Sequence, residues 1–135
     1  MNENLEGRIK KILSMRRNLE AQLLFYQVDA DYKQIDYKQN SEITKLNCLL
    51  KGIDSLFLLV SEEERMILRL HLVEGMKWES VIAEYEKRWP YDKGADKRTY
   101  IYRQQTALKK IASYIKQYAM KIDFSWMADP AFDEE

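Results

Sequence analysis

Apolar residues within residues 1–60 recur at alternating steps of four and three, which places them on one face of an α-helix. The first stripe comprises Leu5, Ile9, Ile12, Arg16, Leu19, Leu23 and Tyr26. The second stripe comprises Gln39, Ile43, Leu46, Leu50, Ile53, Phe57 and Val60. Two such helices joined by a short polar segment predict an antiparallel hairpin or coiled-coil arm, either closed on itself or paired with a second chain.

Three further helices are predicted beyond this arm. Ser61 followed by Glu64 forms a capping-box pattern that begins the first helix, and Gly75 is placed to end it in the left-handed conformation. The second helix ends before Pro90, because the residue preceding a proline is biased away from helical geometry. A polar turn follows, and a long third helix then begins near Lys97.

The composition changes again after residue 121. Acidic residues there surround four large apolar side chains, which are Phe124, Trp126, Met127 and Phe132. This segment either folds back onto the helices or, as an acidic-aromatic tail, docks a partner or shields the basic helix; composition leaves both alternatives open. We therefore divide the chain into a helical hairpin at 1–60, a three-helix domain at 61–121 and a tail at 122–135.

Composition supports an all-α fold. Only 4 glycines and 2 prolines occur among the 135 residues, and strong helix formers recur throughout. The formal net charge is zero, but nucleic-acid binding depends on where charge lies rather than on its total. Residues 97–121 contain no acid, and their basic members are Lys97, Arg98, Arg103, Lys109, Lys110, Lys116 and Lys121.

Four runs of residues carry a resemblance to a known family. They are EEERMIL at 62–68, EGMKWESVIA at 74–83, RTY at 98–100 and TALKKI at 106–111. Together they resemble the helix-turn-helix of sigma-70 region 4, and with the helical arm ahead of them the chain looks most like the phage-encoded ArpU/RinA-type transcriptional regulators of Gram-positive bacteria. The similarity covers residues 61–116 and consists of core positions. It implies a C-terminal three-helix domain whose last helix enters the major groove of DNA.

Side-chain chemistry selects candidate contacts on that last helix. Arginine can form a two-pronged hydrogen bond to guanine and glutamine can do so to adenine, whereas lysine and hydroxyl groups suit phosphate oxygens. The candidate DNA-binding residues are Lys97, Arg98, Thr99, Tyr102, Arg103, Gln104, Lys109 and Lys110. The alternative is a solvated basic face on a long helix. The turn at 88–96 is longer than the three or four residues usual in a helix-turn-helix, which leaves the docking angle open.

Other chemistry finds little support in the sequence. His71 is the only histidine and Cys48 the only cysteine, and neither has the partners that a catalytic or metal site requires. No phosphate-binding glycine-rich loop or recognisable nucleophile is present. We therefore expect no enzyme activity, no metal and no cofactor. Without an apolar run of about 20 residues or a secretion signal at the start, we expect a cytoplasmic protein with no membrane contact.

These features predict a sequence-specific DNA-binding transcriptional regulator, encoded by a phage or prophage. The expected partners are double-stranded DNA and a second copy of the chain, which pairs through the N-terminal stripes and presents two recognition helices to two half-sites. Direct contact with RNA polymerase is left open. The alternatives are a DNA-packaging accessory that resembles a small terminase subunit, and a helical protein-interaction adaptor without DNA binding.

Overall fold

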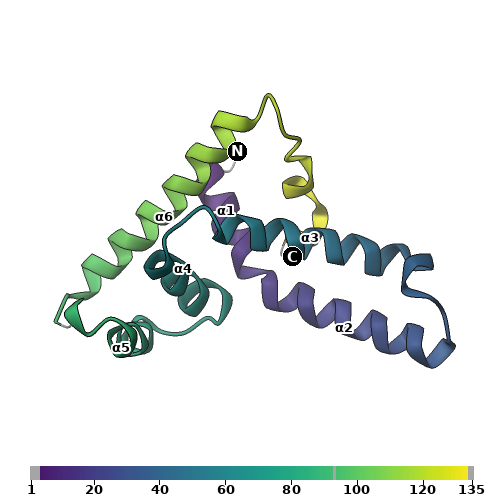
Figure 1. The fold of residues 1–135 in the computed structure, drawn as a ribbon, viewed down its shortest axis with the longest axis horizontal. Helices are drawn as coiled ribbons and strands as arrows, with labels where there is room; N and C mark the ends of the chain where they lie inside the picture. Colours follow the sequence, from purple (N-terminus) through teal and green to yellow (C-terminus); the bar gives the residue numbers. More distant parts are fainter. Residues whose placement is uncertain (1–3, 93, 134–135) are drawn as a thin grey trace.

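The computed structural model describes residues 4–92 and 94–133, which form helices joined by short turns (Figure 1). The α-helices are α1 (Leu5–Ser14), α2 (Arg16–Lys33), α3 (Ser41–Phe57), α4 (Glu62–Leu68), α5 (Trp78–Arg88) and α6 (Lys97–Tyr118). The shorter turns are η1 (Tyr37–Gln39), the π-helical η2 (Arg69–Val73), η3 (Pro90–Asp92), η4 (Ser125–Ala128) and η5 (Pro130–Phe132). No strand occurs in the described ranges, which confirms the all-α class. Nor does any helix within them combine the length and apolarity needed to cross a membrane.

Local sequence signals set several helix ends. The side chain of Ser61 accepts a hydrogen bond from the Glu64 backbone while the Glu64 carboxylate accepts one from the Ser61 backbone, so the predicted capping box is confirmed. Gly75 has φ +68°, the left-handed conformation expected at the end of the first helix. The next helix, α5, ends at Arg88, two residues before Pro90, as predicted.

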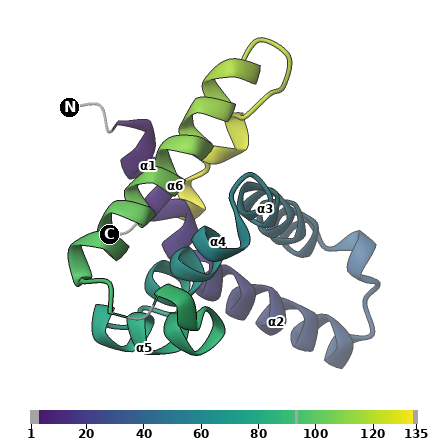
Figure 2. The same cartoon turned by 60° about the vertical axis from the view of Figure 1, so that its left-hand side comes forward.

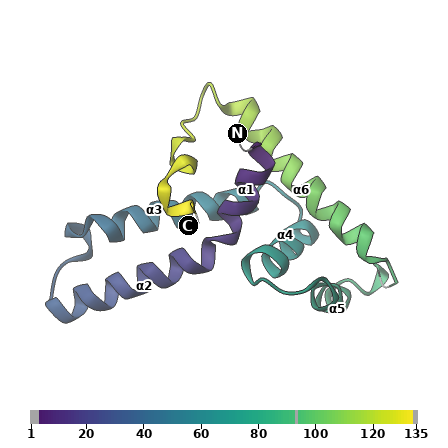
Figure 3. The ribbon, with the colours of Figure 1, turned by 180° about the vertical axis from the view of Figure 1, so that it is seen from behind.

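The helix predicted from the first apolar stripe, which begins at Leu5, is bent at Met15 rather than continuous. α2 and α3 pack side by side in opposite directions (Figures 1 and 3), whereas α1 leaves this pair and packs against α6 and η2. The apolar stripe thus has two partners: Ile9 and Ile12 are buried beside α6, and Leu19 is buried beside α3. A straight helix could not place both halves of the stripe against these two differently directed helices.

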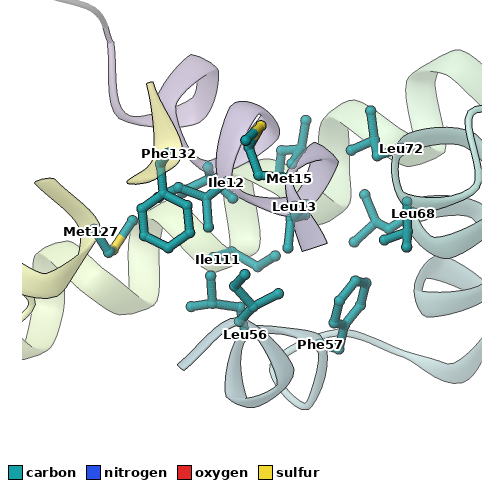
Figure 4. Close-up of a cluster of buried hydrophobic side chains, with 14 of the residues drawn as sticks. Ile12, Leu13, Met15, Leu56, Phe57, Leu68, Leu72, Ile111, Met127 and Phe132 are labelled. Carbon is teal, nitrogen blue, oxygen red and sulfur yellow. The ribbon is translucent and has the colours of Figure 1, made fainter. Parts of the chain in front are cut away.

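One hydrophobic core joins distant parts of the chain. Figure 4 shows side chains from α1, the end of α3, α4 with η2, α6 and the C-terminal segment converging on one another. The labelled residues are Ile12, Leu13, Met15, Leu56, Phe57, Leu68, Leu72, Ile111, Met127 and Phe132. The core therefore continues across the division predicted between residues 60 and 61.

The two N-terminal stripes are occupied within the chain. Their apolar members are largely buried against α3, α6 and each other. Arg16, the charged member, donates from Nε to the Asp54 carboxylate at 2.8 Å and from a terminal nitrogen to Glu20 at 2.7 Å. The expectation that a second chain pairs along these stripes is therefore corrected, because the apolar surface it needs is already covered.

The C-terminal segment folds back onto α1 and α3. Arg8 in α1 donates from Nε to the Met127 carbonyl oxygen at 2.9 Å and forms an ion pair with Asp133 at 2.6 Å, which holds the pKa of the Asp133 carboxyl below its usual range. The Trp126 ring lies against Gly52, where a Cβ atom would be 2.8 Å from the ring. Of the two alternatives for the tail, the structure shows the folded-back one.

Replacing Gly52 with alanine tests this tail contact. In a solvated helix the change would stabilise by about 1 kcal/mol, but here the added methyl would collide with the Trp126 ring. We expect Gly52→Ala to leave the free energy of unfolding unchanged or to lower it, as measured by urea denaturation. In a Trp126→Ala background the same change should recover the gain of about 1 kcal/mol. Equal effects in both backgrounds would contradict the packing.

Candidate nucleic-acid interface

The start of α6 is fixed by a side-chain cap. Asp96 precedes the helix, and its carboxylate accepts hydrogen bonds from the backbone N–H and the hydroxyl of Thr99, both at 3.0 Å. These hydrogen bonds hold the pKa of Asp96 below its usual range. The cap stabilises the helix terminus and uses the hydroxyl that the sequence had assigned to phosphate binding.

One face of α6 is buried along its length. Its members are Tyr100, Gln104, Ala107, Leu108, Ile111, Ala112 and Ile115, and they pack against α1, α4 and α5. Figure 2 shows α6 crossing this group of helices, with α5 near its first turns. Because this face is fully used, the rotation of α6 about its own axis is set by the core.

The opposite face of α6 carries an exposed row that we call the outer basic stripe. It consists of Arg98, Tyr102, Gln105, Lys109, Ser113 and Lys116, all exposed to solvent. The steps of three or four that link these residues match the helical period, so they form one row about 27 Å long. Lys97 is also exposed beside its start, and α6 contains no acidic residue. Tyr102 is 67 % exposed, so its ring stands out from the protein.

Two predicted basic contacts lie off this stripe. The half-buried Arg103 guanidinium lies over the rings of Tyr85 and Tyr100, at 5.5 and 5.1 Å from their centroids. Lys110 donates to the Glu64 carboxylate of α4 at 2.8 Å. Both cations are thus engaged with neighbouring helices, and their contribution to a nucleic-acid surface is smaller than the sequence suggested.

Gln104 requires a clear correction. Its side chain is only 5 % exposed, and its Oε1 lies 2.7 Å from Nδ1 of His71. The His71 ring is in turn stacked on Trp78 with 3.9 Å between ring centroids. The amide of Gln104 therefore contacts a half-buried aromatic pair and is not presented to a base edge. Gln105, one residue further along, is the glutamine that faces solvent.

The outer basic stripe also contains Ser113 and Lys116, which the sequence had not selected as DNA contacts. Gln105 and Lys116 belong to it, whereas Gln104 does not. The helical period would have separated these residues, because positions four, seven, eleven and eighteen beyond Arg98 share its face. The predicted set consisted mainly of consecutive residues, which point to different faces of a helix. It therefore included buried, flanking and exposed positions.

Two contacts join described residues of the connection between α5 and α6 to the end of α5. The rings of Trp89 and Tyr85 are tilted by 36° with 4.8 Å between their centroids, and the backbone N–H of Gly94 donates to the Glu86 carboxylate at 3.0 Å. Gly94 has φ +96°, a conformation that side chains disfavour. The turn is therefore long, as predicted, but held to the end of α5.

Glu64 links α4 to α6. Burial opposes its ionisation, but hydrogen bonds from Lys110 and from Ser61 outweigh that effect and hold its pKa below the usual 4.5. The ionised carboxylate therefore serves the helix cap and the contact with α6 at once.

Comparisons with models of known protein families, with curated proteins and with solved structures found no match. Within the part of the chain that the structure describes, no three His, Cys, Asp or Glu side chains gather as a metal-binding group.

The Glu64 contacts predict a pH-dependent stability. Glu64→Gln keeps a capping side chain but removes the charge, so at neutral pH it should lower the free energy of unfolding by at most about 1 kcal/mol. Because the folded pKa lies below 4.5, this stabilisation is present above that pH and is lost as the pH falls through the folded value. Urea unfolding should therefore show the two proteins converging in acid. A difference that stays constant with pH would contradict the assignment.

Proposed function

We propose that this protein binds double-stranded DNA through the outer basic stripe of α6 and acts as a transcriptional regulator. The observation that carries the proposal is the acid-free, exposed row that begins at Arg98 and ends at Lys116, on a helix whose other face is locked into the core. A surface held this rigidly does not have to become ordered when it binds, so less conformational entropy is lost.

The side chains of the stripe suit the chemistry of a duplex. The major groove is about 12 Å wide and accepts an α-helix, and the exposed face of α6 can lie in it. Arg98 can donate two hydrogen bonds to a guanine edge, and Gln105 can donate one hydrogen bond to an adenine edge and accept one from it. Lys109 and Lys116, further along the helix, are suited to phosphate oxygens, which position a protein without specifying sequence.

The order of the helices supports the same proposal. The helices α4, α5 and α6 contact one another, and the last of them carries the basic row, as in a helix-turn-helix in which α6 is the recognition helix. The long connection at 89–96 differs from the short turn of that motif. In the proposal, the angle at which α5 lies to the groove therefore differs from that of a helix-turn-helix with a short turn.

Removing two cations from the stripe tests DNA binding. We expect Arg98→Ala with Lys109→Ala to weaken binding at least about tenfold, because the base contact of Arg98 is lost together with the phosphate contact of Lys109, and the lost phosphate contact lowers the slope of log affinity against log salt by about 0.9. The measurement is fluorescence anisotropy on a mixed-sequence duplex of roughly three helical turns over a range of salt concentrations.

The matched control is Lys38→Ala with Lys51→Ala, which makes the same charge change at exposed positions outside α6. It should leave the salt slope and the affinity nearly unchanged. Equal losses in the two double variants would mean that only net charge matters, and an unchanged affinity in the α6 variant would refute the proposed surface. Selection of bound sequences from a random DNA pool then tests sequence preference.

A further inference from the structure

Helix α2 has apolar residues on two opposite faces. On its inner face, Leu19 and Ala30 are buried and Leu23 packs against the core. Its outer face carries a second apolar row, which we call the outer seam and which consists of Ala21, Leu24, Phe25, Val28 and Tyr32, all exposed. Phe25 is 72 % and Tyr32 88 % exposed, so these rings have almost no cover from their own chain.

The spacing of the outer seam is that of a helix–helix contact. Ala21, Phe25, Val28 and Tyr32 follow one another at steps of four, three and four, with Leu24 beside Phe25, as in the seam of a two-helix coiled coil. Figures 1 and 3 show α2 along the edge of the molecule, with α3 beside its inner face. A helix that is apolar on both sides is expected to be covered on both sides.

We propose that the outer seam binds the same seam of a second copy, with the two α2 helices antiparallel. A register that sets Leu24 of one copy against Phe25 of the other also sets Ala21 against Val28. The small side chain thereby faces a branched one, and the same pairs recur on both sides of the two-fold axis. In this register Arg17 faces Tyr32, a guanidinium against an aromatic ring.

The charges at the ends of α2 favour a second copy in this direction. Arg17 lies at the start of the outer seam and Asp31 beside its end, and both are exposed. An antiparallel pair brings Arg17 of one copy close to Asp31 of the other, whereas a parallel pair sets Arg17 against Arg17. Among the described residues, Arg17 pairs with Glu74 at 3.7 Å, and both side chains are exposed; such a pair is weak enough to exchange.

The size of the seam determines how tight the dimer is. The 18 residues of α2 extend for about 27 Å, and one helix pair of that length lies at the small end of specific interfaces. Association is therefore reversible and depends on protein concentration. The inference does not rest on the proposed function, because association is measured without DNA. If both hold, each assembly carries two outer basic stripes.

Analytical ultracentrifugation of the full chain up to about 100 μM tests the dimer. The wild type should approach twice the mass of one chain, and Phe25→Glu should remain at the mass of one chain at every concentration. Because Phe25 is 72 % exposed, the variant should keep the wild-type melting temperature at low protein concentration, where the wild type is monomeric as well. The matched control Leu58→Glu changes an equally exposed apolar residue outside the seam and should still dimerise. A monomeric wild type, a larger assembly, or a dimer that survives Phe25→Glu would overturn the proposal.

Single-cysteine cross-linking tests the direction, in a Cys48→Ser background because Cys48 is exposed. Leu24→Cys places two thiols near the two-fold axis and should form an intermolecular disulfide readily under mild oxidation. Tyr32→Cys places them at opposite ends of the antiparallel pair and should not. Efficient cross-linking of Tyr32→Cys instead would overturn the antiparallel arrangement.

Discussion

The packing of α6 against the core is the interaction on which the rest of the structure depends. Tyr100 and Ile111 are fully buried on its inner face, and α1, α4 and α5 surround that face. Rotation of α6 about its axis would remove these buried side chains from the core, and cavities of that kind cost several kcal/mol. The same packing therefore determines which side chains of α6 point outward: Gln105 faces solvent, whereas its neighbour Gln104 is buried.

The two ends of the chain strengthen that packing. The first helix, α1, lies against α6, and Arg8 on α1 holds the C-terminal segment through Met127 and Asp133. The segment in turn adds Met127 and Phe132 to the core. Its aromatic residues are thus used for folding. The outer seam lies on α2, outside this packing. The proposed DNA contact and the proposed self-association therefore use different helices.

Local features were predictable from sequence because their causes are local. The capping box at Ser61 and the left-handed stop at Gly75 depend on a few neighbouring residues. The bend at Met15 was not predictable in this way, because α1 and α2 each continue one apolar stripe and only the direction of α6 decides where the stripe must turn. The helical period is enough to predict that Gln104 is buried. Its partner His71 lies 33 positions away in sequence, so this contact could not be predicted from local features. The outer seam of α2 was not predicted from the sequence, because the stripe on the inner face is sufficient to predict the helix.

The most direct test of the central claim, that the outer face of α6 contacts DNA, is an NMR titration of the isotope-labelled full chain with a mixed-sequence duplex of roughly three helical turns. Amide signals of Arg98, Tyr102, Gln105 and Lys109 should shift together as duplex is added, and the shifts should weaken as salt is raised. Shifts confined to α2 and α3, or no shifts at low salt, would contradict the account.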